Sequence, residues 1–159
     1  MSDTARQRLI IVDGHNLMHH DSELMRRMGS DFERARHHLV QRLECLTSLY
    51  ERVVVVFDGR GEKKQSESRL ANLEVVFSPS HLTADSVIER LVFEAADPSL
   101  VTVVTSDRSE RDTVEAAGAA SMGCSNFMEV LERQEREVRS RVRGTRQSVQ
   151  GARLGDFFP

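Results

Sequence analysis

Four short runs of mostly apolar residues, at positions 9–12, 53–57, 73–77 and 100–105, are the most regular feature of the chain. Each run is rich in β-branched residues and ends at a turn-forming or acidic pair: Asp13-Gly14, Asp58-Gly59, Ser78-Pro79 and Ser106-Asp107. Continuous apolar runs of this length are typical of strands buried on both faces, as in a parallel sheet. A fifth, shorter strand is expected near residues 119–121.

Between these runs, apolar residues recur at the three- and four-residue spacing of amphipathic helices. The pattern predicts helices at 31–50, 84–95, 108–117 and from about 125 to 143, with Asp31, Thr83 and Ser125 as candidate caps. Strands that alternate with helices predict an α/β fold, a three-layer sandwich around a mostly parallel central sheet of about five strands. We expect residues 1–143 to form one domain and residues 144–159 to form a flexible basic tail.

Composition narrows the class of protein. A chain of 159 residues with 30% charged side chains suits one globular domain, and its apolar runs are far shorter than the roughly 20 residues that cross a bilayer. The first eight residues lack the apolar stretch of a secretory signal. The only cysteines, Cys45 and Cys124, form no CxxC pair, which argues against a disulfide framework or a structural zinc site. We therefore expect a cytoplasmic protein without a membrane partner.

The net charge of −3 conceals an asymmetry along the chain. Residues 1–131 carry six more acidic than basic side chains, whereas residues 132–159 carry three more basic than acidic ones. An acidic body argues against a protein that coats nucleic acid by charge alone. It leaves room for a local acidic site that a cation neutralises.

Aspartates gather at one edge of the predicted sheet. Asp13, Asp58 and Asp107 each follow a strand, and Asp85 opens the helix after the third strand. Ligands of open parallel sheets bind outside the carboxyl ends of the strands, so these four carboxylates are expected to meet there. Such a cluster is costly unless a cation opposes it, and a set of oxygen ligands without His or Cys favours Mg²⁺ or Mn²⁺ over zinc.

Other interpretations of these residues stay open. Aspartate after a strand is also ordinary turn chemistry, and Asp85 suits the first turn of a helix because the helix dipole favours an acid there. His15, close behind Asp13, is the best-placed candidate for a histidine general base.

The order of motifs along residues 9–131 resembles the NYN domain, in particular its YacP-like branch of the PIN-like nucleases. The segments that carry this resemblance are Ile10-Ile11-Val12-Asp13-Gly14-His15-Asn16-Leu17, Val54-Val55-Val56-Phe57-Asp58, Val75-Val76-Phe77-Ser78, Thr83-Ala84-Asp85-Ser86-Val87-Ile88-Glu89 and Val103-Val104-Thr105-Ser106-Asp107. One departure is His15, at a position where an aromatic residue such as Tyr is more usual in the family.

The resemblance implies a PIN-like, Rossmann-like fold and a metal-dependent endoribonuclease. Asp13, Asp58, Asp85 and Asp107 match the family's acidic metal site, which would hold Mg²⁺ or Mn²⁺. Asn16 matches a characteristic asparagine that orients Asp13 or a phosphate, and Thr105 and Ser106 match hydroxyl positions beside the last acid.

RNA is the partner that this activity requires. Basic residues close behind two of the aspartates are candidates for phosphate contacts: Arg60, Lys63, Lys64, Arg69, Arg108 and Arg111. The final helix and the basic tail are candidates for recruiting a partner such as the ribosome, with mRNA as substrate, or a second subunit. The sequence leaves the oligomeric state open.

Two alternatives differ in class from an RNA-cutting enzyme. The first is a non-catalytic RNA- or ribosome-binding module with a PIN-like fold, and the presence of all four acids favours the enzyme over it. The second is a receiver-like phosphoacceptor domain. That domain needs adjacent acids after the first strand and a lysine after the last, and this chain has neither.

Overall fold

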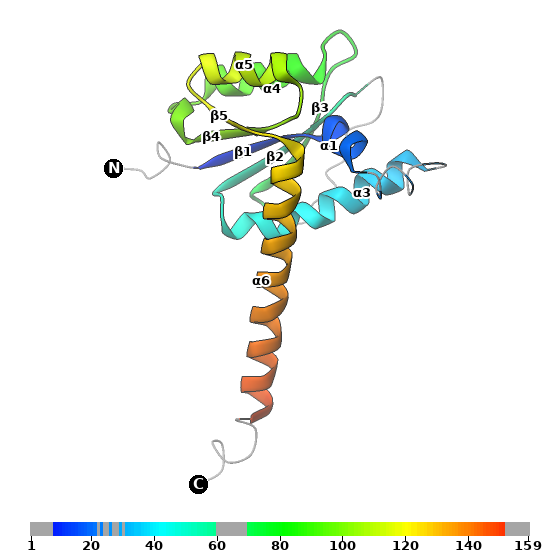
Figure 1. Ribbon diagram of the computed structural model, residues 1–159, viewed down its shortest axis with the longest axis vertical. Coiled ribbons are helices and arrows are strands. Elements are labelled where there is room, and N and C mark those ends of the chain that lie inside the picture. The colour runs from blue at the N-terminus through cyan, green and yellow to red at the C-terminus, as the bar shows by residue number, and fades with distance from the viewer. Residues whose placement is uncertain are drawn as a thin grey trace.

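Five parallel strands form one central sheet in the computed structural model of the chain (Figure 1). The structure describes residues 8–59, apart from 22, 24, 25, 27, 28 and 30, and residues 70–151, with side chains as far as residue 144. The sheet has the order β3-β2-β1-β4-β5 and every pairing is parallel, which confirms the expected fold class. The strands are β1 (Leu9–Asp13), β2 (Arg52–Phe57), β3 (Leu73–Phe77), β4 (Val101–Val104) and β5 (Ala120–Met122).

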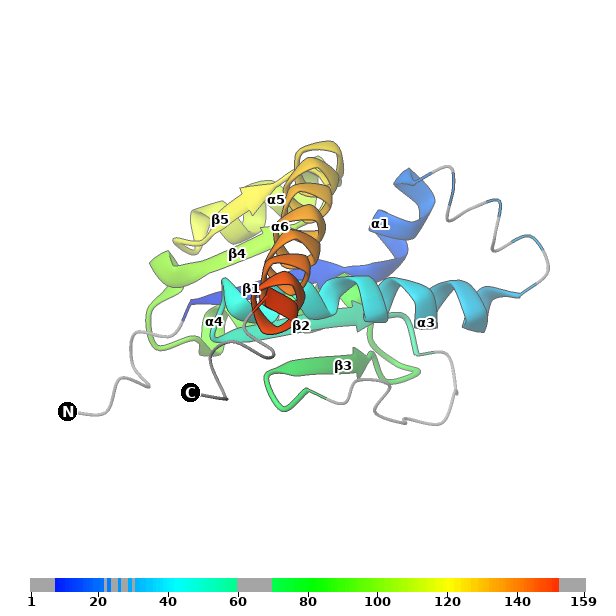
Figure 2. The ribbon, with the colours of Figure 1, turned by 90° about the horizontal axis from the view of Figure 1, so that it is seen from below.

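Helices cover both faces of this sheet. On one face lie α4 (Ala84–Glu94) and α5 (Arg108–Ala116); on the other lie α1 (Gly14–His20), α3 (Phe32–Leu43) and α6 (Cys124–Gly151) (Figure 1 and Figure 2). Ile10 and Val12 of β1 belong to the hydrophobic cluster under α3 and α6, whereas Leu9 and Ile11 belong to the cluster under α4. Because each central strand buries both of its faces, its sequence is a continuous apolar run.

Several helix boundaries differ from those expected. The helix predicted at 31–50 ends at Leu43 and continues as a 3-10 segment, η2 (Glu44–Ser48). The last helix begins at Cys124, so Ser125 lies inside its first turn and does not cap it. That helix extends to Gly151, so the tail expected at 144–159 begins within it, and residues 152–159 lie outside the described residues. The caps predicted at Asp31 and Thr83 are confirmed.

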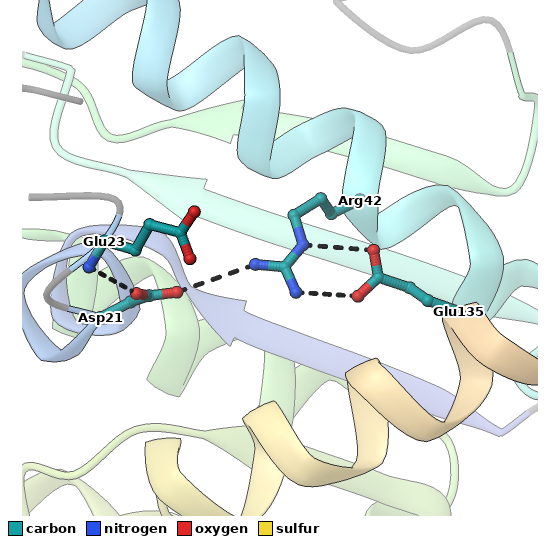
Figure 3. Close-up of polar contacts among 4 residues, drawn as sticks. All are labelled: Asp21, Glu23, Arg42 and Glu135. Carbon is teal, nitrogen blue, oxygen red and sulfur yellow. Dashed lines mark hydrogen bonds and ion pairs between the residues drawn. The ribbon is translucent and has the colours of Figure 1, made fainter.

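The first part of α6 is fixed to the body by side-chain contacts. Arg42 of α3 donates two hydrogen bonds to Glu135 of α6, at 2.8 and 3.2 Å, and also lies 3.7 Å from Asp21 at the end of α1 (Figure 3). The residue before Glu135, Gln134, donates to the hydroxyl of Ser48 at 2.8 Å. Beyond this anchor, α6 projects from the body (Figure 1). None of the described helices has the length and apolarity needed to cross a bilayer.

The topology puts a change of direction at the centre of the sheet. From β1 the chain moves outwards through β2 to β3, and it then returns to the other side of β1 for β4 and β5. In sheets of this kind, the crevice beyond the carboxyl ends of the strands at such a switch point is where ligands bind. The carboxyl ends of β1 and β4 therefore define the place to look for a functional site.

A close backbone approach supports this edge of the sheet at Gly59. Its N–H donates to the hydroxyl of Ser78 at 3.1 Å, and a Cβ added to Gly59 would overlap the backbone carbonyl oxygen of Ser78. By contrast, a Cβ added to Gly144 of α6 would meet nothing within 4 Å.

We expect Gly59→Ala to lower the free energy of unfolding by about 1–3 kcal/mol, since the backbone must shift to relieve the overlap. For a chain of this size that is a fall in Tm of several degrees. Gly144→Ala is the matched control and should leave Tm unchanged or higher, because alanine is the better helix former. Equal Tm values for the two variants in a thermal melt would contradict this account of Gly59.

Candidate metal centre

A pocket of about 600 Å³ opens beyond the carboxyl ends of the strands. All four aspartates singled out in the sequence contribute to its wall, although they come from four different parts of the chain. The residues that line it are Asp13, His15, Asn16, His19, Phe32, Asp58, Thr83, Ala84, Asp85 and Asp107. The parallel sheet therefore brings these acids to one edge.

Three carboxyl groups form a cluster that extends from the pocket wall to Glu110, which lies behind it. One oxygen from each of Asp13, Asp85 and Glu110 lies within 4.8 Å of the other two. The side chains of Asp13 and Glu110 are buried, with exposed fractions of 5% and 3%, and Asp85 is half-buried. Asp58 and Asp107 also line the pocket but do not belong to this cluster.

Sequence reasoning missed Glu110, although its spacing carried a signal. Asp107 caps α5 by accepting the N–H of Glu110 at 3.3 Å, so Glu110 stands at the third helical position, where a glutamate normally reaches back to the capping residue. In that usual arrangement, the glutamate accepts the backbone N–H of the capping residue. Here the hydroxyl of Thr105 accepts the N–H of Asp107, at 3.1 Å, in place of Glu110. The same hydroxyl donates to Oε2 of Glu110 at 3.0 Å, which holds the glutamate facing inwards.

Ionisation of these carboxyl groups is unfavourable, because two of them are buried and all three lie close together. Burial, together with the charges of Asp13 and Asp85, raises the pKa of Glu110 to about 9, and the hydrogen bond from Thr105 offsets only part of this. Burial also raises the pKa of Asp13, against the opposing effect of the N–H of Asn16. At neutral pH and without a cation, Glu110 is therefore protonated.

A divalent cation fits these residues. The buried Oε1 of Glu110 receives no hydrogen bond from the described residues, and its neighbours in the cluster are two further carboxyl groups. Without a cation, only a proton shared between Glu110 and Asp13 can satisfy this oxygen. All the donors are oxygens, which is the chemistry that Mg²⁺ and Mn²⁺ prefer. A bound cation would satisfy the open oxygen and relieve the repulsion among the three acids.

Asn16 ties the pocket to two other parts of the chain. Its N–H donates to Asp13 at 3.2 Å, while its side-chain oxygen accepts the N–H of Ser106 at 2.8 Å and the thiol of Cys124 at 3.2 Å. The hydroxyl of Ser106 in turn accepts the N–H of Cys124 at 2.9 Å. Asn16 and Ser106 thus fix the start of α1, the loop before α5 and the start of α6 relative to one another.

The chain that carries this site matches a known family of domains. Residues 10–156 match the model of the YacP-like NYN domain, nearly the whole chain. This chain belongs to the YacP-like NYN domain family. It is 33% identical over 141 residues to the uncharacterized protein YacP of Bacillus subtilis (strain 168), across 85% of this chain and 81% of that protein.

Solved structures agree with this assignment. The crystal structure of Rae1 (YacP) from Bacillus subtilis matches this NYN domain with a TM-score of 0.74 and 29% identity, over 91% of this chain and 85% of that one. A mutant of Rae1 (YacP) matches with a TM-score of 0.67 and 29% identity, over 86% and 82% of the two chains. The family is PIN-like and nuclease-type, so the acidic cluster lies in a fold associated with that class of enzyme.

His15 of this NYN domain is held in one orientation. Its Nδ1 accepts the backbone N–H of Asp58 at 3.0 Å, and its ring stacks on Phe32 with centroids 5.0 Å apart. A neutral ring bonded in this way carries its proton on Nε2, so it has no lone pair left to take a proton from water. This geometry argues against His15 as a general base.

The basic residues proposed for RNA divide into two groups. Arg60, Lys63, Lys64 and Arg69 lie outside the described residues. Arg108 and Arg111 line a second pocket of about 440 Å³, which also includes Ser106, the neighbour of Asp107. The guanidinium of Arg111 is oriented by a hydrogen bond from Nε to Ser121 at 3.0 Å. This second pocket, which Asp112 and Glu115 also line, lies next to Asp107 along the chain.

The raised pKa of Glu110 predicts how stability depends on pH in EDTA. Between about pH 4.5 and 9 the folded state holds a proton that the unfolded state has lost, so the free energy of unfolding falls as pH rises. Glu110→Gln removes this group, and its Tm should exceed that of the wild type by several degrees near pH 8.5 but not near pH 5. Glu94→Gln, at an exposed position of α4, should follow the wild type. Parallel curves of Tm against pH for Glu110→Gln and the wild type would contradict the burial of an uncompensated Glu110.

Proposed function

We propose that this NYN domain is a divalent-metal-dependent endoribonuclease that hydrolyses RNA phosphodiester bonds in the cytoplasm. The observation that carries the proposal is the cluster of Asp13, Asp85 and Glu110 at the switch point of the sheet, in a nuclease-type family. The two cysteines of the domain are free thiols, which suits a reducing compartment such as the cytoplasm.

In this proposal, Asp13, Asp85 and Glu110 hold Mg²⁺ or Mn²⁺ directly. A bound ion of this kind lowers the pKa of a coordinated water and stabilises the charge that develops on the phosphate. Asp58 and Asp107, which also line the pocket, would bind the ion through water or hold a second ion. Thr105 keeps Glu110 in place, and Asn16 and Ser106 keep Asp13 and the loop before α5 in register. Hydrolysis by water leaves a 5′-phosphate and a 3′-hydroxyl.

Substrate phosphates on either side of the cut would meet Arg108 and Arg111. Both residues border the second pocket, which shares Ser106 with the loop that carries Asp107. The outer part of α6 adds three exposed arginines, Arg136, Arg139 and Arg143, which are spaced three and four residues apart on one face. Arg139 also borders a pocket lined by Asp21, Glu23, Glu132 and Glu135. This face suits docking on a large RNA-containing partner such as the ribosome, with mRNA as substrate.

A non-catalytic RNA-binding module is the alternative. Such a module has no need to bury Glu110 beside two other carboxyl groups, at a cost in stability. The arrangement therefore favours the enzyme.

We expect cleavage of mixed cellular RNA in Mg²⁺ or Mn²⁺ and none in EDTA. Asp13→Asn and Glu110→Gln should each lower the rate at least about a hundredfold, since each removes a direct ligand, whereas Asp107→Asn should cost about tenfold. The matched control is Asp97→Asn, a capping aspartate at the opposite edge of the sheet, which should retain the wild-type rate. Full activity in EDTA, or in Asp13→Asn, would rule out the metal mechanism; RNA binding without cleavage under every condition would favour the alternative.

Phosphate contact by Arg108 predicts a change in the salt dependence of RNA binding. Arg108→Gln should weaken binding to RNAs of different sequence to a similar extent, and it should lower the slope of log K against log[salt] by about 0.7–1. Arg90→Gln, at an exposed position of α4, is the control and should leave the slope unchanged. Binding of labelled RNA measured from 50 to 200 mM salt tests this, and identical slopes for Arg108→Gln and the wild type would exclude the contact.

A further inference from the structure

The acidic pocket is lined on one side by aromatic rings. On one side lie Asp85 and Asp107, at the beginnings of α4 and α5, while on the other lie two aromatic rings, His15 of α1 and Phe32 of α3. Figure 2 shows α1 and the beginning of α3 on the same side of the sheet, beyond the arrowheads of β2 and β3. The pocket therefore combines an acidic part with an aromatic part.

The aromatic wall is built on the core. His15 and Phe32 stack at 5.0 Å with 18° between their planes, and the edge of His15 meets the buried ring of Phe57 at 5.7 Å. Phe57 itself stacks on Phe77 at 5.9 Å. The hydrogen bond from Asp58 to Nδ1 fixes the rotation of His15. This chain of contacts holds the two rings in place before any ligand arrives.

Phe32 is not fully withdrawn into the core. It is partly buried and lines the pocket, whereas Phe57 and Phe127 are completely buried. A flat apolar surface beside a group of carboxylates is a poor match for an ion alone. It suits a ligand that has an anionic part and a flat aromatic part, and a nucleotide has both. The volume of about 600 Å³ lies in the range of pockets that take ligands of that size.

We propose that Phe32 and His15 form a nucleobase subsite, against which the base beside the scissile phosphate stacks. This inference rests on the proposed function and specifies its substrate: the base must be unpaired, so the substrate is single-stranded RNA or an RNA loop. Stacking on an aromatic side chain tolerates any base, so the subsite positions the strand without fixing a sequence.

The test compares RNA oligomers that differ at single positions. Each oligomer has one base replaced by an abasic ribose, and KM is measured with the wild type, Phe32→Leu and Phe32→Tyr. For the wild type, we expect the abasic sugar beside the cut to raise KM about tenfold. Phe32→Leu should raise KM for intact RNA to a similar extent. With this variant, the abasic sugar should raise KM little further, because both changes remove the same contact. Phe32→Tyr keeps a stacking ring and should behave like the wild type.

Phe93→Leu is the matched control, because Phe93 is 66% exposed on α4 and lies outside the pocket lining. It should leave KM for every oligomer unchanged. Thermal melts of all three Phe32 forms check that each is folded. The same abasic penalty in Phe32→Leu as in the wild type, or no penalty in the wild type, would overturn the subsite.

A second readout does not depend on cleavage. An oligomer with 2-aminopurine at the position beside the cut, or at each position in turn, should lose fluorescence on binding the wild type in EDTA, since stacking quenches this base. The protein concentration is raised until fluorescence anisotropy shows that the oligomer is bound. The quenching should be absent with Phe32→Leu and present with Phe32→Tyr. If no RNA is cleaved but this pattern holds, the proposed function fails while the subsite stands. If the wild type cleaves RNA but does not quench the fluorescence, the proposed function stands while the subsite fails.

Discussion

Repulsion among three carboxyl groups is the constraint around which this edge of the molecule is built. Asp13 ends the central strand, where it pairs with Val56 of β2, so its backbone cannot move away without breaking the sheet. Glu110 is held inwards by Thr105, and Asp85 stands in the first turn of a helix capped by Thr83. Because all three backbone positions are fixed and Asp13 and Glu110 are buried, a proton or a cation is needed to relieve the repulsion between these two groups.

The beginnings of three helices converge on the same pocket. α1 and α5 start at Asp13 and Asp107, whose Oδ1 atoms accept N–H groups of the first turn, and α4 starts beside Asp85. A carboxylate offers about four acceptor positions, so capping a helix leaves lone pairs that face the pocket. The partial positive charge of each helix beginning also offsets part of the negative charge there. The same side chains thus define where the helices begin and supply the oxygens of the site.

Much of this arrangement could be predicted from the sequence, because it follows from local rules. The strands are continuous apolar runs, and the rule that parallel strands end at one edge places Asp13, Asp58, Asp85 and Asp107 around one pocket. Glu110 could not be found in this way. Whether a glutamate in the first turn faces the cap or the core depends on how α5 packs on the sheet, and Thr105, which follows β4, fixes this through its hydrogen bonds.

The helices show the same limit. α1 is only seven residues long and gives too few positions for a periodic pattern, so the capping of Asn16 by Asp13 defines it better than hydrophobicity does. The predicted end of α6 at residue 143 comes before its observed end at Gly151, because the side chains at 139–144 are exposed and the apolar spacing that marks a helix reflects burial. Sequence patterns therefore locate the helices that pack against the sheet. They miss a short helix defined by one capping hydrogen bond, and the part of a helix that is exposed to solvent.

The acidity of the pocket also determines how metal and RNA influence one another. On the proposed function, RNA would bring negative charge to a place that already holds Asp13, Asp85 and Glu110, so each charge that a cation cancels there would remove a repulsion against the phosphate. Linkage is reciprocal, and RNA bound at the pocket must therefore strengthen the binding of the cation by the same factor. An acidic body and a polyanionic substrate are compatible on this account, because the cation that relieves the carboxyl groups is the one that attracts the phosphate.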